Sequence, residues 1–183
     1  MQDIIVYISL DTASKEKETL LPLILSFEGE SDYKEYANLE AVAKDFTSAT
    51  SATYLTAKAI FDQIKVENCP GRTKKVAIYG VATDAEAAEV TAALDTLREA
   101  NDEWYFLLPA TTDKTMIAAL AVWADATVLT LAQLEAGYVE AEKLLIAQLM
   151  DKTAITDDMK KLRQSVICYN HDAANTSLPG AWV

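Results

Sequence analysis

The chain has 183 residues, of which 51% are hydrophobic and 24% are charged. This composition is ordinary for a folded domain with one substantial core, and it excludes a chain that is disordered throughout. The net charge at pH 7 is −12. A surface that negative repels a phosphate backbone, so we expect no nucleic-acid partner.

Thiol and imidazole ligands for a metal are few and scattered in this sequence. They are Cys69, Cys168 and His171, whereas a zinc site needs three or four such ligands close together. We therefore expect no metal or other cofactor, and idle thiols in a reducing compartment. The chain starts without a basic signal-peptide region, and no apolar stretch approaches the roughly 20 residues of a membrane helix. The expectation is synthesis in a cytoplasm without membrane insertion.

The first predicted elements are two apolar β segments separated by a charged break. Residues 4–10 are rich in β-branched side chains and predict a strand, and residues 11–19 are charged. Residues 20–25 form a second apolar run, in which Pro22 has no backbone N–H to donate. This run should therefore begin late or lie at a sheet edge. Residues 29–32 predict a turn.

Two helices are predicted next. Asn38 is placed to cap the first, and the apolar face of that helix is formed by Leu39, Val42, Ala43 and Phe46. The second helix is predicted over residues 52–64, and its apolar positions are Tyr54, Leu55, Ala59, Ile60 and Ile64.

Strands and helices alternate in the second part of the chain. The apolar run at residues 76–81 predicts a strand that is covered on both faces. A capping box at residues 83–86 predicts a helix that continues to about Ala100, with three inward residues: Val90, Leu94 and Leu97. A strand is predicted at residues 104–108. Thr112 and Asp113 open the next predicted helix, whose inward residues are Met116, Ile117, Leu120 and Trp123. The remaining predicted elements are a strand at 127–131, a helix at 132–150, a short helix at 157–162 and a last strand at 165–169.

This alternation predicts an α/β fold with a mainly parallel sheet and helices on both faces, which is a three-layer arrangement. Residues 1–30 are expected to form an N-terminal β extension, or arm, that precedes the α/β domain. Residues 31–183 are expected to form that domain.

Two strand–helix turns are candidates for a nucleotide site, because ligands of doubly wound sheets bind at such turns. The turn at residues 79–85 has one glycine, Gly80, and Asp84 and Glu86 place negative charge where a phosphate would lie. The turn at residues 109–114 offers two hydroxyls and Lys114 for an oxyanion, but it lacks glycine. Helix capping explains both turns without a ligand.

Other catalytic arrangements also lack partners in the sequence. His171 is the only histidine and lies in a polar terminal segment without a nucleophile elbow. Carboxylate pairs such as Asp157 with Asp158, or Asp32 with Glu35, are common in an acidic chain. Asp11 lacks the companions of an aspartyl phosphotransfer site, and the aromatic residues Trp104, Tyr105 and Trp123 are expected in the core. We therefore expect that the chain is not an enzyme.

Five blocks of sequence, in order, resemble the sheath proteins of contractile phage tails and related prophage particles. They are residues 3–12, 36–46, 54–61, 103–106 with 117–124, and 166–172 with 181–183. Sheath proteins of this family continue into a further C-terminal domain, so the chain resembles the N-terminal portion of a sheath. The blocks cover most of the chain, although each is short.

The resemblance implies a structural role in a virion tail. Sheath subunits stack as rings around a tail tube, and their contraction drives the tube through the host envelope without nucleotide. The implied partners are other sheath subunits and the tail tube, and the implied location is the virion, after synthesis in the bacterial host cytoplasm. Neighbouring subunits of this family join by strand addition, and the candidate segment here is Ile4, Ile5, Val6, Tyr7 and Ile8. An ordinary edge strand of the domain itself is the alternative for that segment.

A different class of function stays open. The chain could be a small α/β ligand- or nucleotide-binding domain, or an enzyme of unknown substrate, that uses residues 80–84 or 109–114. The sheath hypothesis predicts that the chain alone is a monomer or a weak dimer.

Overall fold

Strands and helices alternate in the second part of the described chain, as the sequence predicts, whereas the first part has two strands followed by two helices. The computed structural model describes residues 21–47, 50–63, 75–126 and 143–169. Its strands are β1 (Pro22–Ser26), β2 (Ser31–Tyr36), β3 (Val76–Gly80), β4 (Phe106–Pro109), β5 (Leu144–Leu149) and β6 (Ser165–Tyr169). Its α-helices are α1 (Leu39–Asp45), α2 (Ala52–Phe61), α3 (Ala87–Ala100) and α4 (Lys114–Ala126).

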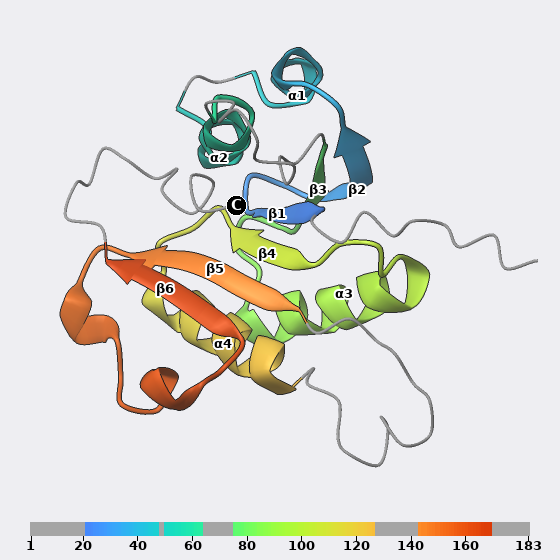
Figure 1. Ribbon diagram of the computed structural model, residues 1–183. Helices are drawn as coiled ribbons and strands as arrows, with labels where there is room; N and C mark the ends of the chain where they lie inside the picture. Colours follow the sequence, from blue (N-terminus) through green and yellow to red (C-terminus); the bar gives the residue numbers. More distant parts are fainter. Residues whose placement is uncertain (1–20, 48–49, 64–74, 127–142, 170–183) are drawn as a thin grey trace, which may run out of the picture.

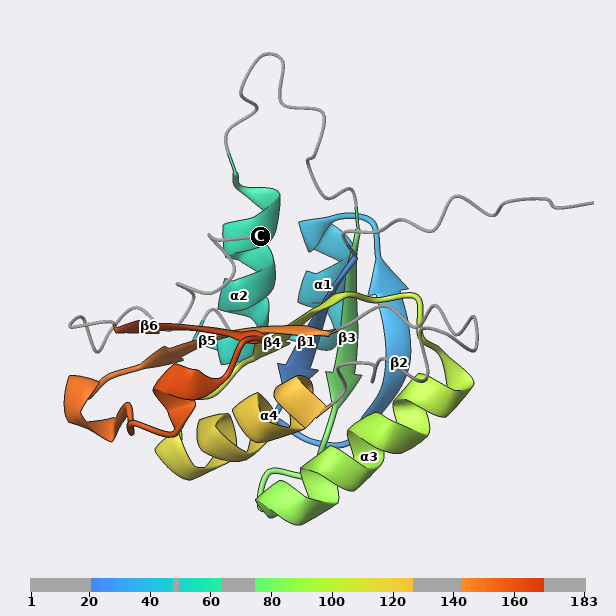
Figure 2. The ribbon, with the colours of Figure 1, turned by 60° about the horizontal axis from the view of Figure 1, so that its bottom comes forward.

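One sheet contains all six strands in the order β2-β3-β1-β4-β5-β6 (Figure 1). Every neighbouring pair is parallel except β2 with β3, which is antiparallel. Helices α1 and α2 cover one face of the sheet, and α3 and α4 cover the other (Figures 1 and 2). The predicted α/β fold with a mainly parallel sheet between two helical layers is confirmed.

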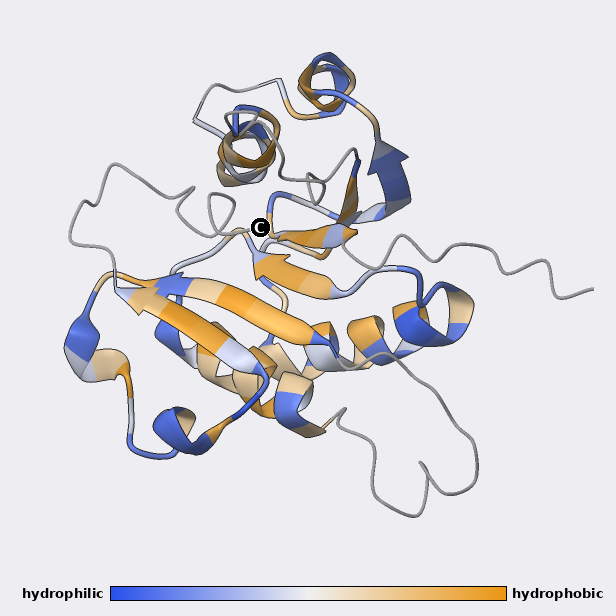
Figure 3. Cartoon of the chain, viewed as in Figure 1, coloured by the Kyte–Doolittle hydropathy of each residue, from blue (hydrophilic) through white to orange (hydrophobic). Residues whose placement is uncertain are grey.

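Each face of the sheet has its own hydrophobic core. Leu23 and Leu25 of β1 pack toward α3 and α4, whereas Ile24 between them packs toward α1 and α2. Successive side chains of a strand point to opposite faces, so a strand in the middle of this sheet must be apolar throughout. Figure 3 shows this in the hydrophobic colour of β1, β4 and β5, in contrast to the hydrophilic β2.

Strand β1 lies in the middle of the sheet, between β3 and β4. The predicted alternative of an edge position for the run that contains Pro22 is therefore wrong, and the predicted late start is correct. Pro22 is the first residue of the strand, where its missing N–H interrupts no ladder. Since β1 belongs to the same sheet as the later strands, a boundary at residue 30 does not separate an arm from a domain within the described residues.

Strand β2 was not predicted, and residues 31–32, assigned to a turn, begin it. Its sequence is SDYKEY, and only Tyr36 is buried. An edge strand with polar residues on both faces lacks the apolar alternation by which strands are recognised. Its pairing with β3 shifts register between Ser31 and Lys34, which marks a bulge.

Strand β5 corrects the predicted helix over residues 132–150. Residues 144–149 form a strand that is parallel to both β4 and β6. A short apolar run that is buried on both faces cannot be distinguished from a buried helix by periodicity. Residues 132–142 of that predicted helix, the predicted strand at 127–131 and the predicted strand at 4–10 lie outside the described residues.

The helix caps follow local sequence closely, with one shift. The Asn38 side chain accepts a hydrogen bond from the Ala41 N–H, as predicted for α1. The α3 capping box forms between Glu86 and Glu89 rather than at residues 83–86, so that helix begins later than predicted. Its predicted inward residues are buried.

The face that α2 buries differs from the predicted one. The buried residues are Thr53, Thr56, Ala57 and Ile60. Two of them are threonines, which the apolar pattern did not select. The predicted Tyr54, Leu55 and Ala59 are only partly buried.

The C-terminal elements agree with the sequence. The short helix predicted near residues 157–162 is a 3-10 turn at Met159–Lys161, preceded by another at Lys152–Ala154. The last predicted strand coincides with β6. In the described part of the chain, none of the helices is both long and apolar enough to cross a membrane.

Candidate functional site

The carboxyl end of the sheet is the first place to look for a ligand, because chain connections diverge there. Strands β3 and β4 lie on opposite sides of β1. Ligands of open parallel sheets bind at such a switch point, outside the carboxyl ends of the strands. The groups at this edge come from the segments that follow β1, β3 and β4.

Glu28, just after β1, occupies the N-terminal end of α2. Its Oε1 accepts a 2.8 Å hydrogen bond from the Ser51 hydroxyl and a 3.1 Å bond from the Thr53 N–H. The Thr53 hydroxyl in turn donates to Ser26 Oγ at 2.8 Å. A helix N-terminus attracts anions, and here the chain's own carboxylate holds that position.

The glycine of the turn after β3 serves the packing of the chain itself. A Cβ atom at Gly80 would lie 2.4 Å from the carbonyl oxygen of Gly29 and 2.8 Å from the backbone nitrogen of Ser31. The loop between β1 and β2 therefore covers Gly80, and this close approach explains the glycine without a phosphate.

A groove of about 890 Å³ lies beside this turn and is strongly acidic. The carboxylate side chains in its lining are Glu30, Asp32, Asp84, Glu86 and Glu89. Glu89 accepts a hydrogen bond from the Glu86 N–H at 3.0 Å, and so part of this charge stabilises the start of α3. Such a lining disfavours a nucleotide or any other anion.

The turn between β4 and α4 also uses its polar groups internally. Asp113 Oδ1 accepts a 2.7 Å bond from the Met116 N–H and caps α4, as predicted. Thr111 Oγ1 accepts a 3.2 Å bond from the Asp113 N–H. A groove of about 510 Å³ lies between this turn and residues 149–151, with Lys114 and Asp151 in its lining. Hydrogen bonds from Thr153 hold the pKa of Asp151 below its usual value.

The carboxylate pairs noted in the sequence have ordinary partners. Asp157 and Asp158 each form an exposed 2.8 Å ion pair, with Lys160 and Lys161 respectively. Glu35 accepts a hydrogen bond from the Tyr33 hydroxyl and lies 3.3 Å from Lys75 Nζ. Exposed pairs of this kind contribute little to stability and do not mark a site.

Of the remaining site residues suggested by the sequence, one cysteine lies among the described residues. Cys168 lies on β6, and burial raises the pKa of its thiol, which disfavours a reactive thiolate. Asp11, Cys69 and His171 lie outside the described residues, and so does the predicted strand-addition segment at residues 4–8.

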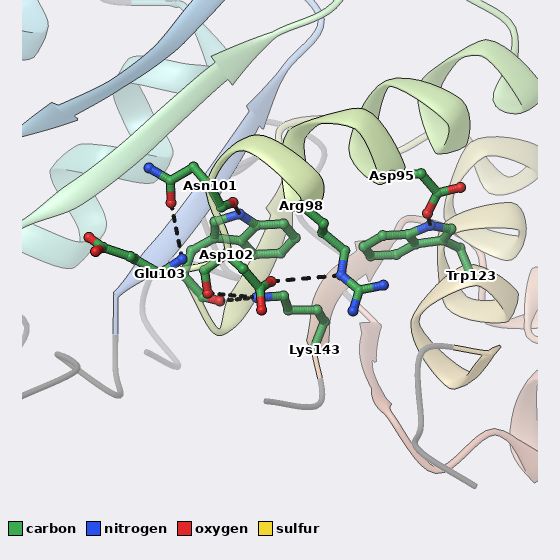
Figure 4. Close-up of polar contacts among 8 residues, drawn as sticks. Asp95, Arg98, Asn101, Asp102, Glu103, Trp123 and Lys143 are labelled. Atoms are coloured by element: carbon green, nitrogen blue, oxygen red, sulfur yellow. Dashed lines mark hydrogen bonds and ion pairs between the residues drawn. The ribbon is translucent and has the colours of Figure 1, made fainter. Parts of the chain in front are cut away.

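Trp104 and Trp123, two of the aromatic residues expected in the core, form a cluster with charged neighbours (Figure 4), whereas the third, Tyr105, is only partly buried. The rings of Trp104 and Trp123 are stacked with centroids 6.3 Å apart. Trp123 Nε1 donates to Asp95 Oδ1 at 2.8 Å, and Trp104 Nε1 donates to the carbonyl oxygen of Asn101 at 3.1 Å. Arg98 lies over the Trp123 ring at 5.9 Å. The core assignment of both tryptophans is confirmed.

Lys143 is the charged residue at the centre of this cluster, and the sequence did not indicate it. Its side chain is fully buried, and Nζ lies 2.5 Å from Asp102 Oδ1. The same nitrogen donates to the carbonyl oxygen of Trp104 and lies 4.1 Å from the Trp104 ring centroid. No local signal could have found it, because its partners are about 40 residues earlier in the chain.

The Lys143 cluster lies at the amino ends of β4 and β5, because Lys143 directly precedes β5 and Trp104 lies just before β4. Ligands of parallel sheets bind at the opposite edge. We therefore interpret the cluster as a clamp that joins the starts of the two strands, rather than as a site of chemistry.

The described residues contain no group of three or more histidine, cysteine, aspartate or glutamate side chains placed to hold a metal ion. No protein-family model matches the chain, and no curated protein matches it. At the carboxyl edge, the groove beside the turn at residues 109–114 has a cation, Lys114, in its lining.

Proposed function

We propose that this chain is a structural subunit of a contractile tail sheath, corresponding to the N-terminal part of such a protein. The observation that carries the proposal is the order of five sequence blocks along the chain. Four of these blocks overlap described elements: residues 36–46 contain α1, residues 54–61 lie in α2, residues 117–124 lie in α4, and residues 166–172 begin in β6. The proposed partners are other sheath subunits and the tail tube.

The carboxyl edge of the sheet supports a role without nucleotide chemistry. Glu28 fills the N-terminal end of α2, and the Gly29 carbonyl covers Gly80. A sheath stores its energy in an extended lattice of subunits, so a subunit needs a stable domain and joints rather than a phosphate cradle. Residues 4–8 are the proposed donor segment for strand addition.

Electron microscopy of contractile particles tests this proposal directly. An antibody raised against the chain should label tails along their whole length in lysates of the producing cells. A gene for a tail-tube protein should also lie next to the gene for this chain. Contractile tails that stay unlabelled, while the same antibody detects the chain elsewhere in the lysate, would overturn the proposal.

A small α/β ligand-binding domain is the second candidate, and the switch point between β3, β1 and β4 favours it. Lys114 and the Thr111 hydroxyl line the groove where an anion would bind. A thermal-shift screen with nucleotides, flavins and common metals separates the two functions, since a ligand that binds the native state raises its apparent stability. The sheath proposal predicts no shift. A shift of several degrees that Lys114→Ala abolishes would favour the ligand-binding domain.

A further inference from the structure

The two edges of the sheet differ in how they are protected. The β2 edge carries Asp32, Lys34 and Glu35 together with a bulge in its pairing to β3. Charges and bulges of this kind prevent another strand from pairing with an edge. Strand β6, at the other edge, has the sequence SVICY, with no charge, proline or glycine. Its register with β5 runs without a shift through all five residues.

The backbone of β6 has hydrogen-bonding groups that point away from β5. The Leu145 N–H donates to the Gln164 carbonyl at 3.0 Å. Alternate residues of a parallel strand bond to the same neighbour, so Val166 and Cys168 continue this ladder toward β5. The N–H and C=O groups of Ser165, Ile167 and Tyr169 therefore face the open edge. Within the described part of the chain, β6 pairs with β5 alone.

Exposed apolar side chains also concentrate on β6. The large hydrophobic residues exposed in the described part of the chain are Val122, Val166 and Tyr169, and the last two belong to β6. Figure 3 shows β6 as a mostly hydrophobic edge strand opposite the hydrophilic β2. An edge strand that is regular, uncharged and apolar is a template for a further strand.

We propose that β6 is a self-association edge at which the β6 strands of two copies pair in antiparallel orientation. A twofold axis at Ile167 would place Ile167 opposite its counterpart, and Ser165 opposite Tyr169 of the other copy. About six hydrogen bonds would then join the outward-facing backbone groups. Val166 would lie opposite Cys168 of the other copy, and the two sheets would become one continuous sheet.

A second copy suits this edge because β6 brings no charge to the joint. The chain as a whole carries a net charge of −12, and like charges on paired strands would oppose association. A joint of one strand pair is small, so we expect a dissociation constant on the order of 100 μM. The pairing is isologous and closes at a dimer. It does not depend on the sheath function.

A matched pair of lysine substitutions tests the edge in the full chain. Val166→Lys places a charge on β6, and Val122→Lys places the same charge on an exposed valine of α4. By sedimentation velocity up to about 1 mM protein, Val166→Lys should weaken dimerisation at least about tenfold, and Val122→Lys should leave it unchanged. Urea unfolding of both variants verifies that they remain folded. A wild-type chain that is monomeric throughout, or equal effects of both variants, would overturn the proposal.

A cross-link tests the register. In the proposed pairing, Val166 and Cys168 of the other copy form a non-hydrogen-bonded pair, with Cα atoms roughly 4.5 Å apart, which suits a disulfide. Val166→Cys should therefore give an oxidised dimer in which peptide mapping finds residue 166 joined to Cys168, and Val122→Cys should not.

A double variant of the full-length chain, Val6→Asp/Ile8→Asp, tests whether the N-terminal segment, rather than a second β6 strand, pairs with the β6 edge. If this variant loses the dimer and Val166→Lys keeps it, the N-terminal segment is the partner and the proposal is wrong.

Discussion

Among the described residues, Lys143 is the only charged side chain that is fully buried. Its partner Asp102 is 27% exposed at the side chain and also lies 3.7 Å from Arg98 Nε. The two members of the pair therefore differ in what their loss leaves behind. Without Asp102 a buried ammonium loses its counter-charge, whereas without Lys143 the carboxylate can still reach solvent and Arg98.

We predict that Asp102→Ala lowers the free energy of unfolding by about 3 kcal/mol, because an unpaired buried charge is costly. Lys143→Met conserves most of the volume and removes the buried charge, so it should cost only about 1 kcal/mol. Urea denaturation measures both. As a control, Lys160→Ala removes a lysine whose side chain is 61% exposed and should cost less than about 0.5 kcal/mol. A larger loss of unfolding free energy for Lys143→Met than for Asp102→Ala would contradict the argument that an unpaired buried Lys143 is the costlier defect.

Gly80 offers a second test at the scale of one residue. Gly80→Ala would bring a Cβ atom against the Gly29 carbonyl and against both the nitrogen and the Oγ of Ser31. Two of these atoms belong to the backbone, so the loop between β1 and β2 must move, at a cost of about 2 kcal/mol. Adding Ser31→Ala should not restore stability, because it removes only the hydroxyl. Full rescue in urea denaturation of the double variant would show that the backbone contacts are unimportant.

At the scale of elements, Asp45 at the end of α1 connects this helix to β2. Its Oδ2 accepts a 2.6 Å bond from Lys34 Nζ and a 2.7 Å bond from the Tyr36 hydroxyl. These hydrogen bonds hold the pKa of Asp45 below its usual value, and the bond from Lys34 has the larger effect. Burial, and then the hydrogen bond to Asp45, raises the pKa of Tyr36. The contact therefore depends on an ionised Asp45.

The direction of the pKa shift gives the pH dependence. The folded state favours the ionised Asp45, so the stabilisation is present above about pH 4 and is lost as pH falls through the lowered pKa. Asp45→Asn should therefore be less stable than wild type at pH 7, with the difference shrinking toward about pH 2. Urea denaturation across this range is the measurement. Asp157→Asn, whose side chain is 89% exposed, is the control and should leave the pH dependence of wild type unchanged. A constant difference for Asp45→Asn at all pH values would contradict the argument.

At the scale of the whole molecule, the edges of the sheet and the net charge set the association behaviour. The β2 edge is blocked by charges and a bulge, and pairing at β6 would use up the other edge. We therefore predict that the isolated chain associates no further than a weak dimer and forms no rings or tubes. Light scattering and negative-stain microscopy at high concentration are the measurements. Regular rings or tubes from this chain alone would show that other surfaces form lattice contacts.

The sequence by itself determined those features that depend on neighbours in the chain. Asn38 and Asp113 cap their helices as predicted, because a cap needs only a side-chain oxygen and an N–H three residues later. The apolar run of β3 predicted a strand covered on both faces, since a strand between two helical layers must be apolar on both faces. Together with the alternation of strands and helices, these local signals were sufficient for the fold class.

Only the tertiary structure decided the features that depend on distant contacts. Residues 144–149 form a strand because β4 and β6 pair with them on both sides, although the run reads equally well as a helix. Residues far apart in the sequence explain both Gly80, covered by the loop after β1, and Lys143, which binds Asp102 and the Trp104 carbonyl. The candidate site follows the same rule. The sequence could identify the candidate turns for a ligand. It could not show that Glu28 occupies the N-terminal end of α2, because Glu28 and Thr53 are separated by 25 positions in the chain.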